Sequence, residues 1–241
     1  MKIKKILSYV ALLSILLTVM PISSFANEPV SVVRNYTDES KFVFDENTNT
    51  ITKFTGDETD IVIPAKINGV DVKAIGKVAF KGKKIKSVVL NEGMEIIGNG
   101  AFAGVTTLEK INFPSTLKKI DDMAFVKTSL KELKLNEGLQ VIGKRAFSNC
   151  SSLQKINLPN SLTKISDNAF EKCKISNDIV FGENLGHVGH KVFSGNGNDI
   201  NISISKNGNK LFLHDELFLK NQNELNIPHG REIMLFVRAF C

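Results

Sequence analysis

Cysteine and histidine are the residue types in this chain whose spacing could support chemistry, and the cysteines are considered first. Cys150 and Cys173 each follow an Ala-Phe pair by three residues, and they are 23 residues apart. If the chain between them forms one turn of a repeat, their thiols lie close enough for a disulfide. The alternative is a ladder of small buried residues, because Val105 and Thr128 fill the same position in earlier repeats. We favour reduced core thiols, and we expect Cys241 to be exposed and able to cross-link two chains.

The histidines offer metal binding as a second candidate chemistry. His187 and His190 are three residues apart, and His214 precedes two acidic residues. A zinc site needs three or four converging ligands, and nothing in the sequence ties these side chains together. The chain also lacks a glycine-rich phosphate loop, a Cys-His nucleophile pair and a His-Glu-x-x-His helix. We therefore predict no catalytic residue, no metal and no cofactor, and we place these histidines on the solvated surface.

An internal repeat accounts for the positions of these residues. A phenylalanine preceded by Ala or Val recurs every 22 or 23 residues, at Phe80, Phe102, Phe125, Phe147, Phe170 and Phe193. A second phrase of the form Leu-x-x-Ile-x-Leu lies between these phenylalanines. Its central residues are Val88, Ile111, Leu133, Ile156, Ile179 and Ile202. Two interleaved ladders with one common period indicate a repeat architecture.

Each repeat predicts one coil of a solenoid. A single coil cannot bury its own apolar edge, so stability must come from stacking on its neighbours. The Ile-x-Leu pair has the period of a strand, which places both apolar side chains inward and the residue between them outward. We therefore expect a repeat solenoid with parallel β-strands on one face and with turns and short helical segments on the other. The Ala-Phe unit is expected to fill the core on that other side.

Residues 146–170 contain the most regular copy of the repeat. They read Ala-Phe-Ser-Asn-Cys-Ser-Ser-Leu-Gln-Lys-Ile-Asn-Leu-Pro-Asn-Ser-Leu-Thr-Lys-Ile and continue to the next Ala-Phe pair. This segment resembles the BspA-like class of bacterial leucine-rich repeats, and residues 61–72 resemble the usual opening of that family. The resemblance covers roughly residues 50–205. It implies a leucine-rich-repeat fold in an extracellular or cell-surface protein, often described as an adhesin, with no shared catalytic residues.

The segments outside the repeats complete the predicted organisation. Residues 1–26 combine three lysines, an uncharged apolar run and a small-residue cleavage sequence, which is the pattern of a signal peptide. Residues 27–60 are expected to cap the first coil through a β-hairpin, and the leucine-rich repeats are assigned to residues 61–205. We interpret residues 206–241 as a two-stranded insert followed by an incomplete repeat. The sequence contains no second apolar run, so we expect no membrane span after signal cleavage.

Net charge gives little information about a partner. The chain carries a formal charge of +6, and three lysines leave with the expected signal peptide, so about +3 remains. That value is too small to indicate nucleic acid as a partner, and an exported protein rarely meets nucleic acid.

Outward strand positions are the candidate partner-binding surface. The positions that flank the central apolar residue in three successive repeats are Lys110, Asn112, Glu132, Lys134, Lys155 and Asn157. Solenoids use such arrays for binding, although the same positions can be a merely solvated face. We expect a secreted or cell-surface module that binds a protein or glycan, and not an enzyme. The alternative is a structural spacer, or a truncated fragment of a longer surface protein, with no ligand of its own.

Overall fold

The structure, a computed structural model, describes residues 36–196, 200–205, 211–214, 225–226 and 233–236. All of these belong to the unit Asn35–Cys241. The expected signal peptide and Cys241 lie outside the described residues. No helix in the described ranges is both long enough and apolar enough to cross a membrane.

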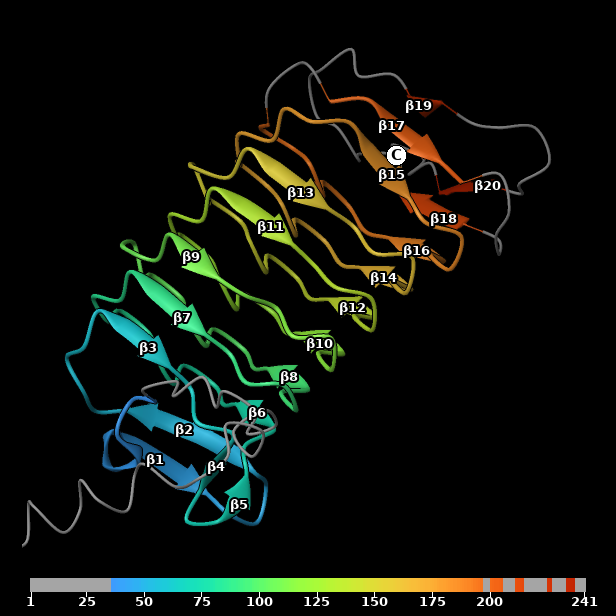
Figure 1. The fold of residues 1–241 in the computed structure, drawn as a ribbon. Helices are drawn as coiled ribbons and strands as arrows, with labels where there is room; N and C mark the ends of the chain where they lie inside the picture. The colour runs from blue at the N-terminus through green and yellow to red at the C-terminus, as the bar shows by residue number, and fades with distance from the viewer. Residues whose placement is uncertain (1–35, 197–199, 206–210, 215–224, 227–232, 237–241) are drawn as a thin grey trace, which may run out of the picture. The chain divides into compact units, whose positions relative to one another are not determined.

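A β-hairpin precedes the first complete coil, as the sequence predicts. β1 (Phe42–Asp45) and β2 (Thr50–Phe54) pair antiparallel. β2 then pairs in parallel with β6 (Ala74–Ile75), so the hairpin continues directly into a strand ladder of the solenoid (Figure 1). The hairpin therefore covers a strand edge of the first coil that would otherwise be open to stray pairing.

One ladder of parallel strands continues from β6 through every later coil. Its strands are β8 (Ile96–Ile97), β10 (Lys119–Ile120), β12 (Val141–Ile142), β14 (Lys164–Ile165), β16 (His187–Val188), β18 (Leu211–His214) and β20 (Ile233–Phe236). With β1, β2 and β6 they form a single ten-stranded sheet. Equivalent positions pair in register, as Ile97 does with Ile120, so buried isoleucines of successive coils stack on one another.

The second ladder comes from the Leu-x-x-Ile-x-Leu phrases and is interrupted twice. Its strands are β3 (Asp60–Val62), β7 (Ser87–Val89), β9 (Lys110–Ile111), β11 (Glu132–Lys134), β13 (Lys155–Asn157), β15 (Ile179–Phe181), β17 (Ile202–Ile204) and β19 (Leu225–Asn226). They form three separate sheets in the order β3-β7-β9, β11-β13 and β15-β17-β19. A short antiparallel hairpin of β4 (Lys66–Ile67) and β5 (Val70–Asp71) follows β3.

A stack of phenylalanine rings fills the core between the two ladders. The rings belong to Phe80, Phe102, Phe125, Phe147, Phe170 and Phe193, and each is at most 2% exposed. Successive ring centroids are 4.9–5.6 Å apart, and the ring planes differ by at most 14°. The predicted core role of the Ala-Phe unit is therefore confirmed. Each stacked pair contributes about 0.5–1.5 kcal/mol beyond the burial of its surface.

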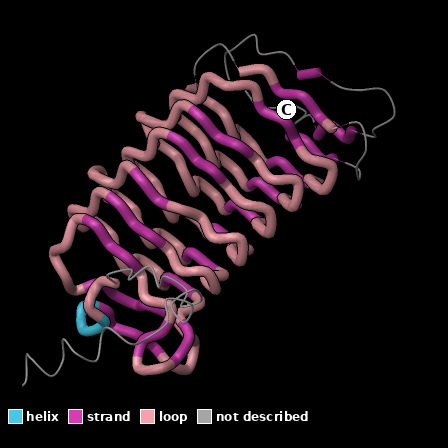
Figure 2. Tube along the Cα trace, viewed as in Figure 1, coloured by secondary structure: helices cyan, strands magenta, loops and turns pink. Residues whose placement is uncertain are grey.

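The side of each coil that carries the Ala-Phe pair consists of turns, where the sequence predicted short helical segments as well. The residue before each of these pairs has a positive φ: Val78 (53°), Gly100 (61°), Met123 (54°), Arg145 (55°), Asn168 (58°) and Lys191 (53°). A right-handed helix cannot continue through such a residue. Backbone N–H groups here bond to the next coil, as Phe102 does to the carbonyl of Ala124 at 2.8 Å. Among the described residues, the only helix is the 3₁₀ turn η2 (Glu39–Lys41), which lies before the repeats (Figure 2).

The described strands after residue 205 extend both ladders, which corrects the interpretation of this segment as a two-stranded insert. β18 pairs in parallel with β16 and β20, and β19 pairs in parallel with β17. Leu225 follows Ile202 by 23 residues, so the period of the second ladder continues where the Ala-Phe landmark is missing. Residues 215–224, which contain the rest of the expected insert, lie outside the described residues.

Candidate functional site: a strand face with an open gap

The described cysteines are core residues. Val105, Thr128, Cys150 and Cys173 occupy equivalent positions in successive coils, and all four are buried. Cys150 and Cys173 are free thiols, and each lies within 3.1–3.2 Å of a backbone carbonyl oxygen of the preceding coil. Burial raises the pKa of the Cys150 thiol to about 11 and raises the pKa of Cys173 as well. The predicted ladder of small buried residues is confirmed, and neither thiol is exposed or ionised enough to act as a nucleophile.

The histidines are less exposed than the sequence suggested. His187 lies in β16 and His190 in the turn after it, and both are half-buried. The backbone N–H of His190 donates to the carboxylate of Asp167 at 3.0 Å. The side chain of His214 lies outside what the structure describes. Within the described ranges, no group of three or more His, Cys, Asp or Glu residues could hold a metal ion.

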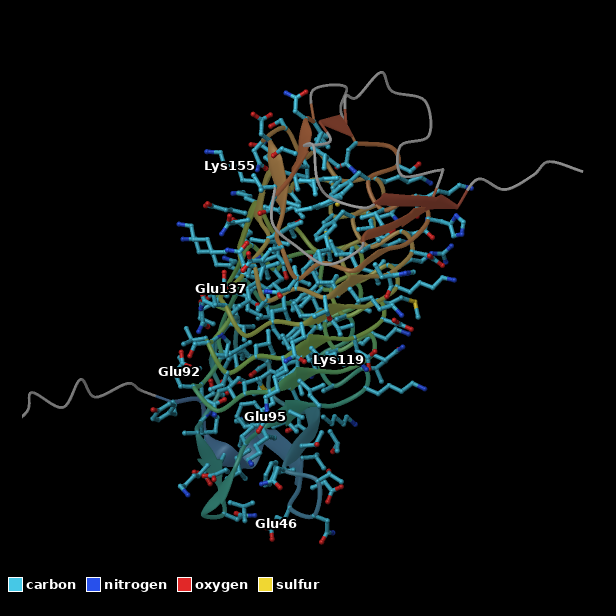
Figure 3. The ribbon with its side chains drawn as sticks, turned by 90° about the vertical axis from the view of Figure 1, so that its right-hand side faces the viewer. Glu46, Glu92, Glu95, Lys119, Glu137 and Lys155 are labelled. Carbon is cyan, nitrogen blue, oxygen red and sulfur yellow. The ribbon has the colours of Figure 1, made fainter. Side chains whose placement is uncertain are left out.

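The six side chains predicted for the partner-binding surface are all exposed. β11 and β13 bring four of them together, because Glu132 lies opposite Lys155 and Lys134 lies opposite Asn157. Lys110 lies in β9, across an interruption of the sheet from β11. Figure 3 shows Lys155 on this side of the solenoid and Lys119 of β10 on the other ladder. The outward-facing side of β7, β9, β11 and β13 is called the strand face below.

Asn112 has a structural role that its sequence position did not indicate. Its side-chain oxygen accepts the N–H of Leu90 at 2.6 Å, and its side-chain N–H donates to the carbonyl of Leu90 at 3.1 Å. This pair of bonds joins the end of β7 to the coil of β9. The amide of Asn112 is therefore bonded within the protein, where it holds two coils together.

A hollow opens in the strand face between β9 and β11. Its volume is about 440 Å³, and it is lined by Glu109, Lys110, Ile111, Asn112, Phe113, Lys131, Glu132, Lys134 and Asn136. Four of the six side chains predicted from sequence are in this lining. Sequence reasoning missed the other five, because it considered only the two residues that flank each central apolar position. It also treated the ladder as continuous, so it did not predict a hollow.

The rim of the hollow carries charges of both signs. Lys131 pairs with Glu109 at 3.0 Å across the gap, and Lys134 pairs with Glu132 at 3.8 Å along β11. The hydrogen bond from Lys131 lowers the pKa of Glu109. These side chains are between 48% and 80% exposed, so each pair is weak and easily exchanged for contacts to a partner. Lys110 makes no ion pair with any described residue.

The interruption of the ladder follows the lengths of successive coils. Leu108 follows Phe102 by six residues, whereas Leu130 follows Phe125 by only five. Elsewhere two successive N–H groups of a coil donate to the coil before it. Gln154 and Lys155 of a long coil donate to the carbonyl of Lys131, and Lys86 and Ser87 of a short coil donate to the carbonyl of Thr59. In the described structure the short coil of β11 makes no such backbone bonds to β9. The coil of β7 is equally short, with five residues from Phe80 to Ile85, and yet β7 pairs with β3. We therefore attribute the gap to the step from a longer coil to one that is a residue shorter.

The second interruption, between β13 and β15, has the same sequence origin. The chain takes six residues from Phe147 to Leu153 and five from Phe170 to Ile175. Here an extra residue follows Ile175, and the side chain of Asn177 fills the position of a strand partner. Its oxygen accepts the N–H of Ile156 at 3.0 Å, and its amide donates to the carbonyl of Ile156 at 3.0 Å. The gap between β13 and β15 is thus closed by the protein itself.

The parallel ladders, the interlocking coils and the buried Leu, Ile and Phe positions define a leucine-rich-repeat protein. Residues 73–213 match the BspA type Leucine rich repeat region in six copies. The chain belongs to this family, as the resemblance of residues 146–170 predicted. None of the curated proteins matches the chain.

Two crystal structures of bacterial proteins are similar to this chain over most of its length. The T. pallidum Leucine Rich Repeat protein is 30% identical with a TM-score of 0.63, and the match covers 70% of this chain and 85% of that one. A leucine rich cell surface protein from Faecalibacterium prausnitzii is 27% identical with a TM-score of 0.52. That match covers 74% of this chain and 55% of the relative, so the chain spans about half of that protein.

Proposed function

We propose that this chain is an exported, surface or extracellular module that binds another protein through the strand face. The observation that carries the proposal is the hollow between β9 and β11, which gathers Lys110, Glu132 and Lys134 around one opening. Membership of the BspA type family supports a surface repeat module, and one structural relative is itself named a cell surface protein. Signal cleavage after residue 26 would release the module outside the cell.

The proposed organisation keeps the segments predicted from the sequence. Residues 1–26 are the signal peptide, residues 27–60 the cap and residues 61–205 the principal repeats. Residues 206–241 form a C-terminal segment whose described strands continue the ladders.

A protein partner fits the strand face better than a glycan. The hollow has an apolar floor of Ile111 and Phe113 and a charged rim, which is the arrangement of many protein interfaces. Among the described residues, the only exposed large aromatic side chain is Tyr36, which lies before the repeats. The strand face therefore offers no flat aromatic ring on which a sugar could stack.

Binding is proposed rather than catalysis because the side chains suited to chemistry lie elsewhere. The lining of the hollow contains neither histidine nor cysteine. Its two carboxylates are each paired with a lysine, so neither is prepared to act as a general base.

The test is a pull-down with the secreted form, residues 27–241, against intact cells and purified extracellular-matrix proteins. A variant with Lys110→Glu, Lys134→Glu and Lys155→Glu reverses charge on the strand face. A matched control reverses three exposed lysines on other sides of the coils, Lys77→Glu, Lys127→Glu and Lys164→Glu. Both variants change the net charge equally and should fold, since all six side chains are exposed.

The proposal predicts saturable binding that the strand-face variant loses by at least about tenfold, or about 1.4 kcal/mol, and that the control keeps. Equal loss in both variants would show that net charge drives the interaction and would contradict a specific face. No partner at micromolar concentration, for a chain shown to be folded, would favour the structural spacer instead.

A further inference from the structure

The two interruptions of the second ladder have the same origin but different outcomes. Between β13 and β15 the side-chain amide of Asn177 accepts a hydrogen bond from the N–H of Ile156 and donates one to its carbonyl, both at 3.0 Å. The residue equivalent to Ile156 at the other interruption is Ile111. No side-chain amide of the described chain bonds to Ile111. One gap is therefore filled by an amide, and the other, the hollow, is open.

The backbone of Ile111 faces the open gap. In a parallel sheet, successive residues of a strand bond alternately to the neighbours on its two sides. The N–H of Lys110 donates to the carbonyl of Lys86 in the coil before it, so Lys110 faces β7. The N–H and the carbonyl of Ile111 therefore lie on the opposite edge of β9, where β11 does not pair. The same alternation places the N–H of Ile156 toward Asn177, as observed.

The ends of the gap are held while its middle is not. The hydroxyl of Ser129 donates to the carbonyl of Thr106 at 2.6 Å at one end. The side-chain amide of Asn136 donates to the carbonyl of Phe113 at the other end. Between these two bonds, only the exposed ion pair of Lys131 and Glu109 crosses the gap among the described residues. The opening is thus a fixed slot between two strand edges.

We infer that this slot receives an extended peptide segment of the partner, which adds as a parallel strand and bonds Ile111 as Asn177 bonds Ile156. The inference rests on the proposed function and specifies the partner as a segment with alternating apolar and polar residues. An open strand edge with unpaired N–H and carbonyl groups is the usual site of such strand addition.

The lining of the hollow also suits the side chains on both faces of an added strand. Side chains of an added strand alternate between its two faces. Those pointing inward would contact the apolar floor of Ile111 and Phe113, and Ile111 is only partly buried at present. Those pointing outward would lie among Lys110, Glu132 and Lys134 on the rim.

The probe is a fluorescent hexapeptide, Leu-Gln-Lys-Ile-Asn-Leu, which copies residues 153–158. These residues contain β13, the strand that already pairs with β11. Its control carries N-methyl groups on the Lys and Asn residues, whose N–H groups would donate to β9 in a parallel register. Methylation removes these two donors and keeps every side chain. Binding is measured by fluorescence anisotropy, and the slot is monitored by the amide signals of Ile111 and Leu133 in NMR spectra.

A plugged variant of the secreted chain tests the location. Replacing Lys131-Glu132 with Ser-Asn-Asp copies residues 176–178 and supplies the amide that closes the other gap. The matched control, Lys131→Ser with Glu132→Asp, makes the same changes without the added asparagine. The N-methylated peptide tests the wild-type chain directly, so the experiment does not depend on the plugged variant folding.

The inference predicts that the peptide binds with a dissociation constant of about 1 mM or lower and that binding shifts the NMR signal of the Ile111 amide. Affinity should fall at least about tenfold on N-methylation, and it should be at least about tenfold lower in the plugged variant than in the matched control, which carries the same changes of charge. Equal binding of the methylated peptide, or unchanged binding to the plugged variant, would overturn it. Absence of peptide binding would also overturn it.

The fate of the proposed function is separate. If the peptide fails while the pull-down still depends on Lys110, Lys134 and Lys155, only the strand-addition idea falls. If heparin binds instead and the plugged variant loses that binding, the slot belongs to an anionic glycan, and a protein partner is rejected along with strand addition.

Discussion

The rings of Phe125 and Phe147 lie 5.2 Å apart with their planes only 2° from parallel. They come from adjacent coils, and both are fully buried. The backbone repeats this relation, because the N–H of Phe125 donates to the carbonyl of Ala146 at 2.7 Å. Each coil is therefore registered on the next by a ring and by a hydrogen bond at the same position, and stability depends on neighbours rather than on single coils.

Loss of one ring from the middle of this stack should be costly. Phe125→Ala removes contacts to the rings of Phe102 and Phe147 and leaves a cavity between them. We expect a loss of about 3–5 kcal/mol in the free energy of unfolding, measured by urea denaturation. Phe125→Leu should cost less because it fills more of the space. An unchanged unfolding midpoint for Phe125→Ala would contradict the register of the core.

Val78 is under backbone strain that a substitution can relieve. Its φ is 53°, a region that is unfavourable for a β-branched residue, and the equivalent position in the next coil is Gly100. Val78 is 43% exposed, so little packing would be lost. Val78→Gly should raise the free energy of unfolding by about 1 kcal/mol.

A matched control separates strain from the general effect of glycine. Val89 is similarly exposed but lies in β7 with ordinary strand geometry. Val89→Gly should lower stability, because glycine weakens a strand. Equal effects of the two changes on thermal unfolding would refute the assignment of strain to Val78.

The thiol ladder should make the fold sensitive to alkali. Burial raises the pKa of Cys150 from 9.0 to about 11, so the folded state holds this proton more tightly than the unfolded state does. The stabilisation is complete below about pH 9 and declines as pH rises toward about 11. The double variant Cys150→Val and Cys173→Val, which repeats the residue type of Val105 in both positions, should lose less stability over that window.

Reagent access gives an independent check of the same ladder. Maleimide should label Cys150 and Cys173 only after denaturation, since both are buried. Rapid labelling of either thiol in the native chain at neutral pH would contradict the buried ladder.

Acid should weaken contacts on the other ladder. Hydrogen bonding and charge from Lys118, at 2.7 Å, lower the pKa of Glu95, and Lys73 lies 3.7 Å away. A carboxylate with a lowered pKa stabilises the fold above its unfolded pKa, and this contribution is lost as pH falls through the folded pKa. The effect should be small and weaker at high salt, because both lysines are exposed and Glu95 is only half-buried. Glu95→Gln should flatten the acid limb of a stability profile, and no change in that limb would contradict the pairing.

The periodic parts of the fold could be predicted from sequence because they repeat a physical pattern. The spacing of Phe102, Phe125 and Phe147 fixed the coil length, and the alternation around Ile156 fixed which side chains point inward. The predicted helical segments are absent from the structure. The sequence did not exclude them, because positive φ at residues such as Met123 leaves no compositional signal as clear as glycine.

The candidate site was predicted only in part, for a related reason. Lys110, Glu132 and Lys134 were found because they flank central strand positions, yet the hollow depends on one residue missing between Thr128 and Leu130. The alternation of 22- and 23-residue repeats was visible in the sequence, but its effect on strand pairing depends on three-dimensional stacking. Asn112 was assigned to a partner because side-chain to backbone bonds between coils have no local sequence signature.

The most direct test of the account is native-state hydrogen exchange at the central strand positions. The N–H of Ile156 is bonded to Asn177, whereas the N–H of Ile111 faces the open gap between β9 and β11. We predict that the Ile111 amide exchanges at least about a hundredfold faster than those of Val88 and Ile156. Protection of Ile111 equal to that of its two counterparts would mean that the ladder is closed, and it would contradict the open slot on which the proposed binding depends.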